Sequence, residues 1–205
     1  FRRQRQMCIR DRATSAHILI IGASHAGLFC AERLRTGGFD GQITLLERDP
    51  GLPLQRPSLS KTYLKADLTD GEGAFALRKE DWFDNFKITF RPACAVASLH
   101  PVHQQLSLTD GSTLSYDHLV LATGAFARPL PKAADAPNLH VLRTAGDARL
   151  LRAGLANVRT ALVIGGGFIG LEVAASVRSL DIDVHVVEIA PRLLARVASP
   201  ALSEH

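Results

Sequence analysis

The sequence predicts an α/β fold in which one strand–helix–strand unit occurs twice. Three observations support this fold class. A short apolar run, a glycine-rich turn, a helical pattern and a second apolar run follow one another over residues 17–47 and again over residues 161–188. The 205 residues are 46% apolar and 21% charged, which is typical of a globular protein. No apolar run reaches the roughly 18 residues that a membrane-spanning helix requires.

The first unit begins with the β-branched run at residues 17–21, which is typical of a buried parallel strand. Gly22 ends this strand, and a helical pattern follows until Gly37-Gly38. The run at residues 43–46 predicts the next strand, and Glu47 stands at its end.

The second unit repeats this order. Residues 161–164 predict a strand, residues 165–170 the turn, residues 171–180 a helix and residues 183–187 a second strand, followed by Glu188. Between the two units the pattern changes. Residues 88–122 alternate as antiparallel strands do, with a turn signal at Asp110-Gly111, and the Pro-rich residues 128–137 predict a crossover linker.

The formal net charge of +4 resides at the start of the chain. Residues 1–12 contain five arginines and one aspartate, and the remainder carries equal numbers of acidic and basic side chains. This balance argues against a nucleic-acid or anionic-membrane partner. The stretch Gln6–Asp11 resembles the translation of a transposon-end sequencing adapter, so we interpret residues 1–12 as an artefact; a natural basic arm or a transit peptide is the alternative.

The three cysteines, Cys8, Cys30 and Cys94, show neither CxxC nor CxxxxC spacing. The sequence therefore predicts neither a disulfide scaffold nor a metal site. This cysteine usage favours a reducing, cytoplasmic location.

The turn of the second unit matches the G-x-G-x-x-G dinucleotide-binding pattern in its full context of strand, helix and acid. Gly165 permits the tight turn, Gly167 lets the backbone approach a pyrophosphate, and Gly170 allows close packing of helix and strand. The helix N-terminus offers free N–H groups to the phosphates. Glu188 is placed to accept hydrogen bonds from the adenosine ribose, which favours NADH over NADPH.

The turn of the first unit departs from the pattern at one position. Residues 22–27 read Gly-Ala-Ser-His-Ala-Gly, so Ser24 replaces the second glycine. A Cβ at this position crowds the pyrophosphate, although the small hydroxyl can donate to a phosphate. Glu47 supplies the acid after the second strand. We expect a second dinucleotide site here.

With these two units the chain resembles the FAD-dependent pyridine nucleotide-disulfide oxidoreductase superfamily, specifically the ferredoxin, rubredoxin and putidaredoxin reductase type. The resemblance covers about residues 16–205 and rests on the two glycine turns with their acids and on four further passages. These are Arg56-Pro57-Ser58-Leu59-Ser60-Lys61, residues 116–124, Leu142-Arg143-Thr144 and residues 190–194.

The resemblance implies that FAD binds first and NADH second. Lys61 and Glu172 would pair beside the flavin as the catalytic residues, because a cation there stabilises the reduced ring. The implied FAD-binding residues are Gly22, Ser24, Ala26, Gly27, Glu47, Arg48, Arg56, Lys61, Val96, Thr123, Gly124 and Arg143. The implied NADH-binding residues are Gly165, Gly166, Gly167, Phe168, Ile169, Gly170 and Glu188.

The expected function is hydride transfer from NADH to flavin, followed by single-electron transfer to a ferredoxin or rubredoxin. A thiol relay is not expected, because the segment where disulfide reductases carry their cysteine pair holds residues 56–61 instead. Two alternatives stay open: a non-catalytic or signalling flavoprotein of the apoptosis-inducing factor type, and an inactive fragment.

The expected domains are an FAD-binding domain over residues 13–127, with a small antiparallel insertion, and a linker with an NAD-binding domain over residues 128–205. Both are expected to be incomplete, because the family continues for roughly as many residues again. We therefore expect a fragment truncated at its C-terminus.

Overall fold

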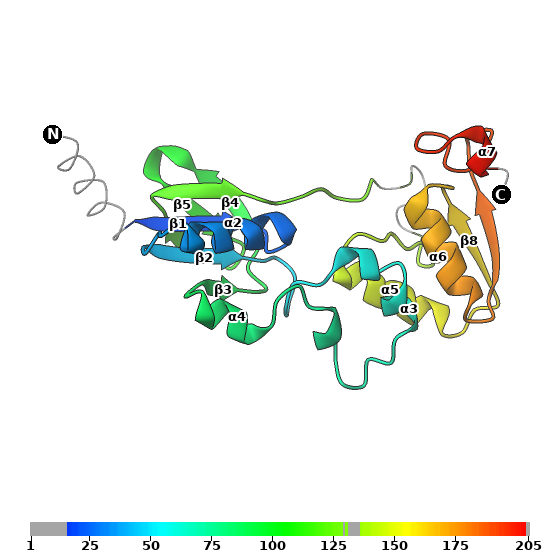
Figure 1. Cartoon of the computed structure of the whole chain (residues 1–205), viewed down its shortest axis with the longest axis horizontal. Coiled ribbons are helices and arrows are strands. Elements are labelled where there is room, and N and C mark those ends of the chain that lie inside the picture. Colours follow the sequence, from blue (N-terminus) through cyan, green and yellow to red (C-terminus); the bar gives the residue numbers. More distant parts are fainter. Residues whose placement is uncertain (1–15, 129, 131–135, 204–205) are drawn as a thin grey trace. The chain divides into compact units, whose positions relative to one another are not determined.

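The computed structural model describes residues 16–128, 130 and 136–203 and divides the chain into two units (Figure 1). The first unit comprises Phe1–Leu54 and Glu72–Ala125, and the second comprises Gln55–Gly71 and Phe126–His205. The predicted adapter and most of the Pro-rich stretch lie outside the described residues. The segment 55–71 belongs with the second unit, and the assignment of FAD- and NAD-binding domains on either side of residue 127 stays a prediction.

A four-stranded parallel sheet forms the centre of the first unit. Its strand order is β3-β2-β1-β7, with β1 at His17–Ile21, β2 at Gln42–Leu46, β3 at Thr89–Arg91 and β7 at His118–Leu121. All three neighbouring pairs run parallel. The carboxyl ends of these strands therefore meet at one edge of the sheet, where ligands bind in α/β folds.

Helix α2 (His25–Thr36) follows β1 and lies against the sheet (Figure 1). Its buried residues Leu28 and Ala31 face β1 and β2, and Gly37 ends it, as the sequence predicts. Two short helical elements, η2 (Gly73–Phe75) and α4 (Glu80–Asn85), precede β3.

An antiparallel sheet of three strands is inserted before β7. It consists of β4 (Val96–His100), β5 (Gln105–Leu108) and β6 (Thr113–Ser115), with η3 (Pro101–His103) between the first two. The predicted antiparallel insertion is confirmed for these strands. It is wrong for β3 and β7, which are parallel strands of the central sheet. Side chains alternate between the two faces of a sheet with a period of two residues in parallel and antiparallel strands alike, so this pattern does not distinguish the two kinds of pairing.

The central sheet separates two apolar layers. One layer lies between the sheet, α2 and α4, and includes Ile18, Ile43 and Phe83. The other lies between the sheet and the antiparallel insertion, and includes Leu19 and Leu106. Because both faces of the parallel sheet are covered, its central strands β1 and β2 are largely apolar, with Ile18–Ile20 and Ile43, Leu45 and Leu46 buried.

The second unit has a two-stranded parallel sheet of β8 (Thr160–Ile164) and β9 (Asp183–Val187), joined by helix α6 (Phe168–Arg178). Alternate residues such as Val163 and Val186 turn to the partly buried side of this sheet. The predicted second unit is therefore confirmed, with its helix beginning three residues earlier than predicted.

Four further elements complete the second unit: η1 (Arg56–Ser58), α3 (Thr62–Lys65), α5 (Ala145–Leu155) and α7 (Pro200–Ser203). Helix α3 contacts both α5 and α6. Within the described residues, no helix has the length and hydropathy needed to cross a membrane.

Candidate functional site

The glycine turn of the second unit has the geometry that a dinucleotide requires. Gly165 has φ +110°, a conformation that side chains disfavour, and its N–H donates to the Val187 carbonyl at 2.8 Å. A Cβ on Gly170 would lie 2.0 Å from the Gly165 carbonyl oxygen, so only glycine permits this approach of α6 to the turn.

The backbone N–H groups at the start of α6 are available as hydrogen-bond donors. The first intrahelical bond runs from the Leu171 N–H to the Gly167 carbonyl at 3.0 Å. In the described part of the chain, the N–H groups of Phe168, Ile169 and Gly170 have no recorded hydrogen-bond partner. A Cβ on Gly167 would meet nothing within 4 Å. An anionic pyrophosphate therefore fits at this helix terminus.

Glu188 is held by the backbone around it. One carboxylate oxygen accepts from the Gly166 N–H at 2.7 Å, and the other accepts from the Ala190 N–H at 2.9 Å. These bonds from Ala190 and Gly166 lower the pKa of Glu188 below its ordinary value. A charged carboxylate can accept about four hydrogen bonds, so capacity remains for ribose hydroxyls.

The first unit repeats this arrangement at the end of β1. Gly22 has φ +104° and its N–H donates to the Leu46 carbonyl at 2.8 Å. Glu47 accepts from the Ala23 N–H at 2.9 Å and from the Asp49 N–H at 3.2 Å. A Cβ on Gly27 would lie 1.9 Å from the Gly22 carbonyl oxygen.

Ser24 stands at the N-cap of α2, and its hydroxyl makes no capping hydrogen bond. The donation of this hydroxyl to a phosphate stays a prediction. Ala26 lies in the first turn of α2 and is exposed. The turn thus accommodates serine at the position where the pattern has its second glycine.

The other predicted residues of the first unit lie close to strand ends. Arg48 follows Glu47 after β2 and forms an ion pair with Asp49 at 3.4 Å. Thr123 and Gly124 follow β7 and are exposed. Val96 begins β4, away from these loops in sequence, and packs partly against the second apolar layer.

Lys61 and Glu172 are an ion pair in the second unit. The Lys61 ammonium lies 3.0 Å from one carboxylate oxygen of Glu172, and their side chains are 52% and 30% exposed. The pairing expected from the resemblance is therefore present, and the role of the pair beside a flavin stays a prediction.

Two serines that the sequence analysis did not select join this pair. The Ser60 hydroxyl donates to the other carboxylate oxygen of Glu172 at 2.6 Å, and the Ser176 hydroxyl donates to the Ser60 carbonyl at 2.7 Å. The Ser60 bond, together with Lys61, lowers the pKa of Glu172. The four-residue spacing of Glu172 and Ser176 was the available signal, because it places both on one helix face.

The two remaining predicted residues, Arg56 and Arg143, also lie in the second unit. Arg56 begins η1. Arg143 precedes the N-cap Thr144 of α5, and its backbone N–H donates to Asp147 at 2.9 Å. Thr144 and Asp147 form a capping box, a signal for α5 that the sequence analysis did not use.

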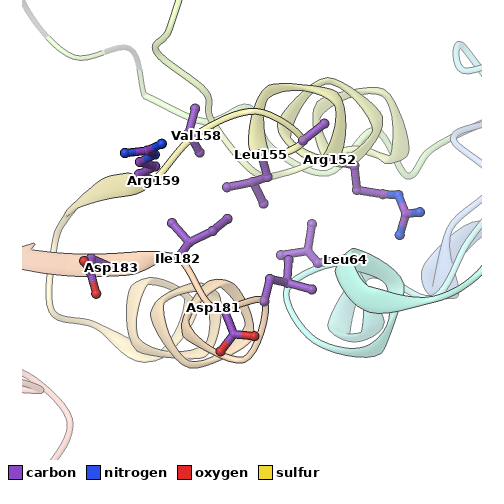
Figure 2. A pocket seen from close by; sticks show the side chains of 10 residues that line it. Leu64, Arg152, Leu155, Val158, Arg159, Asp181, Ile182 and Asp183 are labelled. Atoms are coloured by element: carbon purple, nitrogen blue, oxygen red, sulfur yellow. The ribbon is translucent and has the colours of Figure 1, made fainter.

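A cavity of about 540 Å³ lies elsewhere in the second unit, between α3, α5 and the start of β9 (Figure 2). Apolar side chains including Leu64, Leu155 and Ile182 line it. Arg159 and Asp183 place it at the amino ends of β8 and β9. The glycine turn follows the carboxyl end of β8, so this cavity is separate from the candidate dinucleotide site.

Comparisons with known proteins identify the family of this chain. The sequence profile of the pyridine nucleotide-disulphide oxidoreductase family matches residues 16–205. Rhodocoxin reductase of Rhodococcus erythropolis is 46% identical over 187 residues, covering 91% of this chain and 43% of the relative. The rubredoxin-NAD(+) reductase of Pseudomonas putida is 38% identical over 185 residues, covering 90% of this chain and 48% of the relative.

Among solved structures, the ferredoxin reductase of the CYP199A2 system from Rhodopseudomonas palustris has a TM-score of 0.85 and 39% identity. The match covers 93% of this chain and 46% of that chain. The chain therefore belongs to the pyridine nucleotide-disulphide oxidoreductase family. Ferredoxin reductases of this family use FAD and NAD(P)H. The chain spans less than half the length of the two curated relatives described above.

Proposed function

We propose that the complete protein is an FAD-dependent NADH oxidoreductase that delivers electrons to a ferredoxin- or rubredoxin-type acceptor. The observation that carries this proposal is the repeated turn-and-acid geometry. Glu47 accepts from Ala23 at 2.9 Å in one unit, and Glu188 accepts from Gly166 at 2.7 Å in the other. Two such turns accommodate two dinucleotides. The names of the curated relatives, rhodocoxin reductase and rubredoxin-NAD(+) reductase, support the choice of acceptor.

In this proposal the first turn holds FAD and the second holds NADH. The N–H groups at the starts of α2 and α6 bind the two pyrophosphates, and Glu47 and Glu188 orient the two riboses. A negative carboxylate at Glu188 repels a 2′-phosphate, which favours NADH. Val96 and Arg143 belong to the FAD contacts proposed from the family resemblance.

The ion pair of Lys61 and Glu172 is assigned to the reduced flavin. A bound flavin supplies the chemistry that side chains lack, since it accepts a hydride and releases its two electrons singly. With a flavin bound, the Lys61 ammonium would stabilise the negative charge of the reduced ring, and Glu172 would hold that ammonium in place. The overall reaction balances when one NADH reduces two one-electron acceptors and yields NAD⁺ and one proton.

The proposal includes a cytoplasmic location, which the cysteine usage supports. It also excludes a thiol relay. The segment before α3 presents Lys61 rather than a cysteine pair, and within the described residues the only cysteines are Cys30 and Cys94, both free. Burial raises the pKa of both thiols, so neither is an activated thiolate.

Substitution of Lys61 in the complete, flavin-loaded protein tests the assignment. We expect Lys61→Ala to slow reduction of the flavin by NADH about tenfold in stopped-flow measurements, since a half-exposed cation contributes less than a buried donor. Lys65→Ala is the matched control, because Lys65 is an exposed lysine at the end of α3. Equal rates for Lys61→Ala, Lys65→Ala and the unsubstituted protein would show that the assigned role is wrong.

A further inference from the structure

Ser60 combines a buried position with a contact to a charged group. It is only 4% exposed, whereas the adjacent Lys61 side chain is 52% exposed. Its hydroxyl donates to one oxygen of Glu172 at 2.6 Å, and the Lys61 ammonium lies 3.0 Å from the other oxygen. The two oxygens of one carboxylate therefore have two different partners, both from the same short segment.

The backbone of Ser60 is held by the same helix. The buried Ser176 hydroxyl donates to the Ser60 carbonyl at 2.7 Å. Glu172 and Ser176 are one turn apart on α6, so a single helix face contacts both the hydroxyl and the carbonyl of Ser60. Leu59 and Tyr63, which flank this segment, are 2% and 0% exposed and anchor it further.

We propose that Ser60 is a positioning residue that orients Glu172 toward Lys61, and that Ser176 in turn positions Ser60. This inference rests on the function proposed above for the ion pair.

The Ser60 hydrogen bond limits the rotational freedom of the Glu172 carboxylate. A partly exposed glutamate can rotate its terminal group, and an exposed ion pair is weak because holding two long side chains costs conformational entropy. The Ser60 hydrogen bond removes this rotation, since it holds one oxygen from a buried site. The other oxygen then presents a fixed acceptor to the Lys61 ammonium. The same bond lowers the pKa of Glu172 and so keeps the acceptor charged.

A purely space-filling role for Ser60 predicts different behaviour. In that case Ser60→Ala would alter stability alone, because alanine fills nearly the same volume. A positioning role predicts that loss of the hydroxyl also raises the pKa of Glu172 and alters the properties of the bound flavin. These readouts separate the two roles.

The experiment compares three substitutions in the complete protein: Ser60→Ala, Ser176→Ala and Ser179→Ala. Ser179 is the matched control, because it is an exposed serine of the same helix end whose hydroxyl donates to the Ser176 carbonyl and does not contact Glu172. The readouts are the pKa of Glu172 from carboxyl-carbon NMR, assigned with Glu172→Gln, the midpoint potential of the flavin, and the rate of its reduction by NADH.

We expect Ser60→Ala to raise the pKa of Glu172, to make the flavin potential more negative and to slow reduction about fivefold. Ser176→Ala is expected to act in the same direction to a smaller extent, and Ser179→Ala to match the unsubstituted protein. Ser60→Cys, whose thiol is a poor donor, is expected to show a weaker form of the Ser60→Ala effects. It becomes the deciding variant if Ser60→Ala does not fold.

The outcomes distinguish this inference from the proposed function. If NADH reduces the unsubstituted protein while Ser60→Ala equals Ser179→Ala in pKa, potential and rate, the positioning role is overturned and the proposed function stands. If NADH does not reduce the unsubstituted protein, the proposed function fails. The pKa of Glu172 then decides alone: an unchanged value in Ser60→Ala overturns the positioning of the carboxylate, and a raised value supports it.

Discussion

Two glycines of the second turn allow folding and nucleotide binding to be perturbed separately. A Cβ on Gly170 would stand 2.0 Å from the Gly165 carbonyl oxygen, well inside contact distance, so α6 must move away from the turn. Such overpacking costs about 1–3 kcal/mol. A Cβ on Gly167 would meet no atom within 4 Å, and its φ of −85° suits alanine. Gly167→Ala should therefore change the free energy of unfolding by less than about 1 kcal/mol.

The same Gly167 methyl group would occupy the space assigned to the pyrophosphate. We expect Gly167→Ala to weaken NAD⁺ binding at least about tenfold, measured by titration calorimetry on the complete protein. The free energy of urea unfolding without nucleotide should change by less than about 1 kcal/mol. Gly170→Ala should lose both stability and binding. Unimpaired NAD⁺ binding by Gly167→Ala would refute the reasoning, because the pyrophosphate would then lie elsewhere.

Three further predictions concern the acids and the cap of α5. Glu188→Gln places an amide N–H₂ against the N–H of Gly166 or Ala190. The affinity for NAD⁺ should therefore fall about fivefold, and the preference for NADH over NADPH should become smaller. An unchanged preference would show that Glu188 does not recognise the ribose. The pKa of Glu172 is lower in the folded protein than in the unfolded chain, where a glutamate has a pKa of about 4.3. The Glu172 carboxylate therefore stabilises the fold above about pH 4.3, and this stabilisation is lost as the pH falls through the lower pKa of the folded protein. Between about pH 5 and 3, the free energy of urea unfolding should therefore decrease less for Glu172→Gln than for the unsubstituted protein. Equal decreases would count against the interactions assigned to that carboxylate. Thr144→Ala removes the side-chain acceptor for the Asp147 N–H and should lower the free energy of unfolding by about 1 kcal/mol, and an unchanged urea midpoint would argue against the capping box.

The local pattern was sufficient to predict both strand–turn–helix–strand units. The turn at Gly165 needs a positive φ, and the strands on either side are short apolar runs, so neighbouring residues determine these elements. Glu188 was predicted as a ribose ligand, and Glu47 as the corresponding acid of the first dinucleotide turn. Their bonds to the Ala23 and Gly166 N–H groups were not predicted, because spacing in sequence does not show which way a carboxylate turns.

Long-range contacts account for what the sequence did not predict. Strands β3 and β7 join the parallel sheet through partners far along the chain, and their alternation resembles that of the antiparallel insertion. Helix α3 has only four residues, too few for a helical period to be recognised. The contact of Ser60 with Glu172 joins residues 112 positions apart, so only the fold reveals it.

The most direct test of the proposed function is an anaerobic titration of the complete, FAD-loaded protein with NADH, monitored at the flavin band near ~450 nm. We predict that about one NADH per flavin bleaches this band and that a ferredoxin or rubredoxin then restores it. A tightly bound flavin that NADH does not bleach would contradict the reductase assignment. It would favour a non-catalytic or signalling flavoprotein. It would also remove Lys61 and Glu172 from their proposed roles beside the flavin and Glu188 from its proposed role in NADH binding.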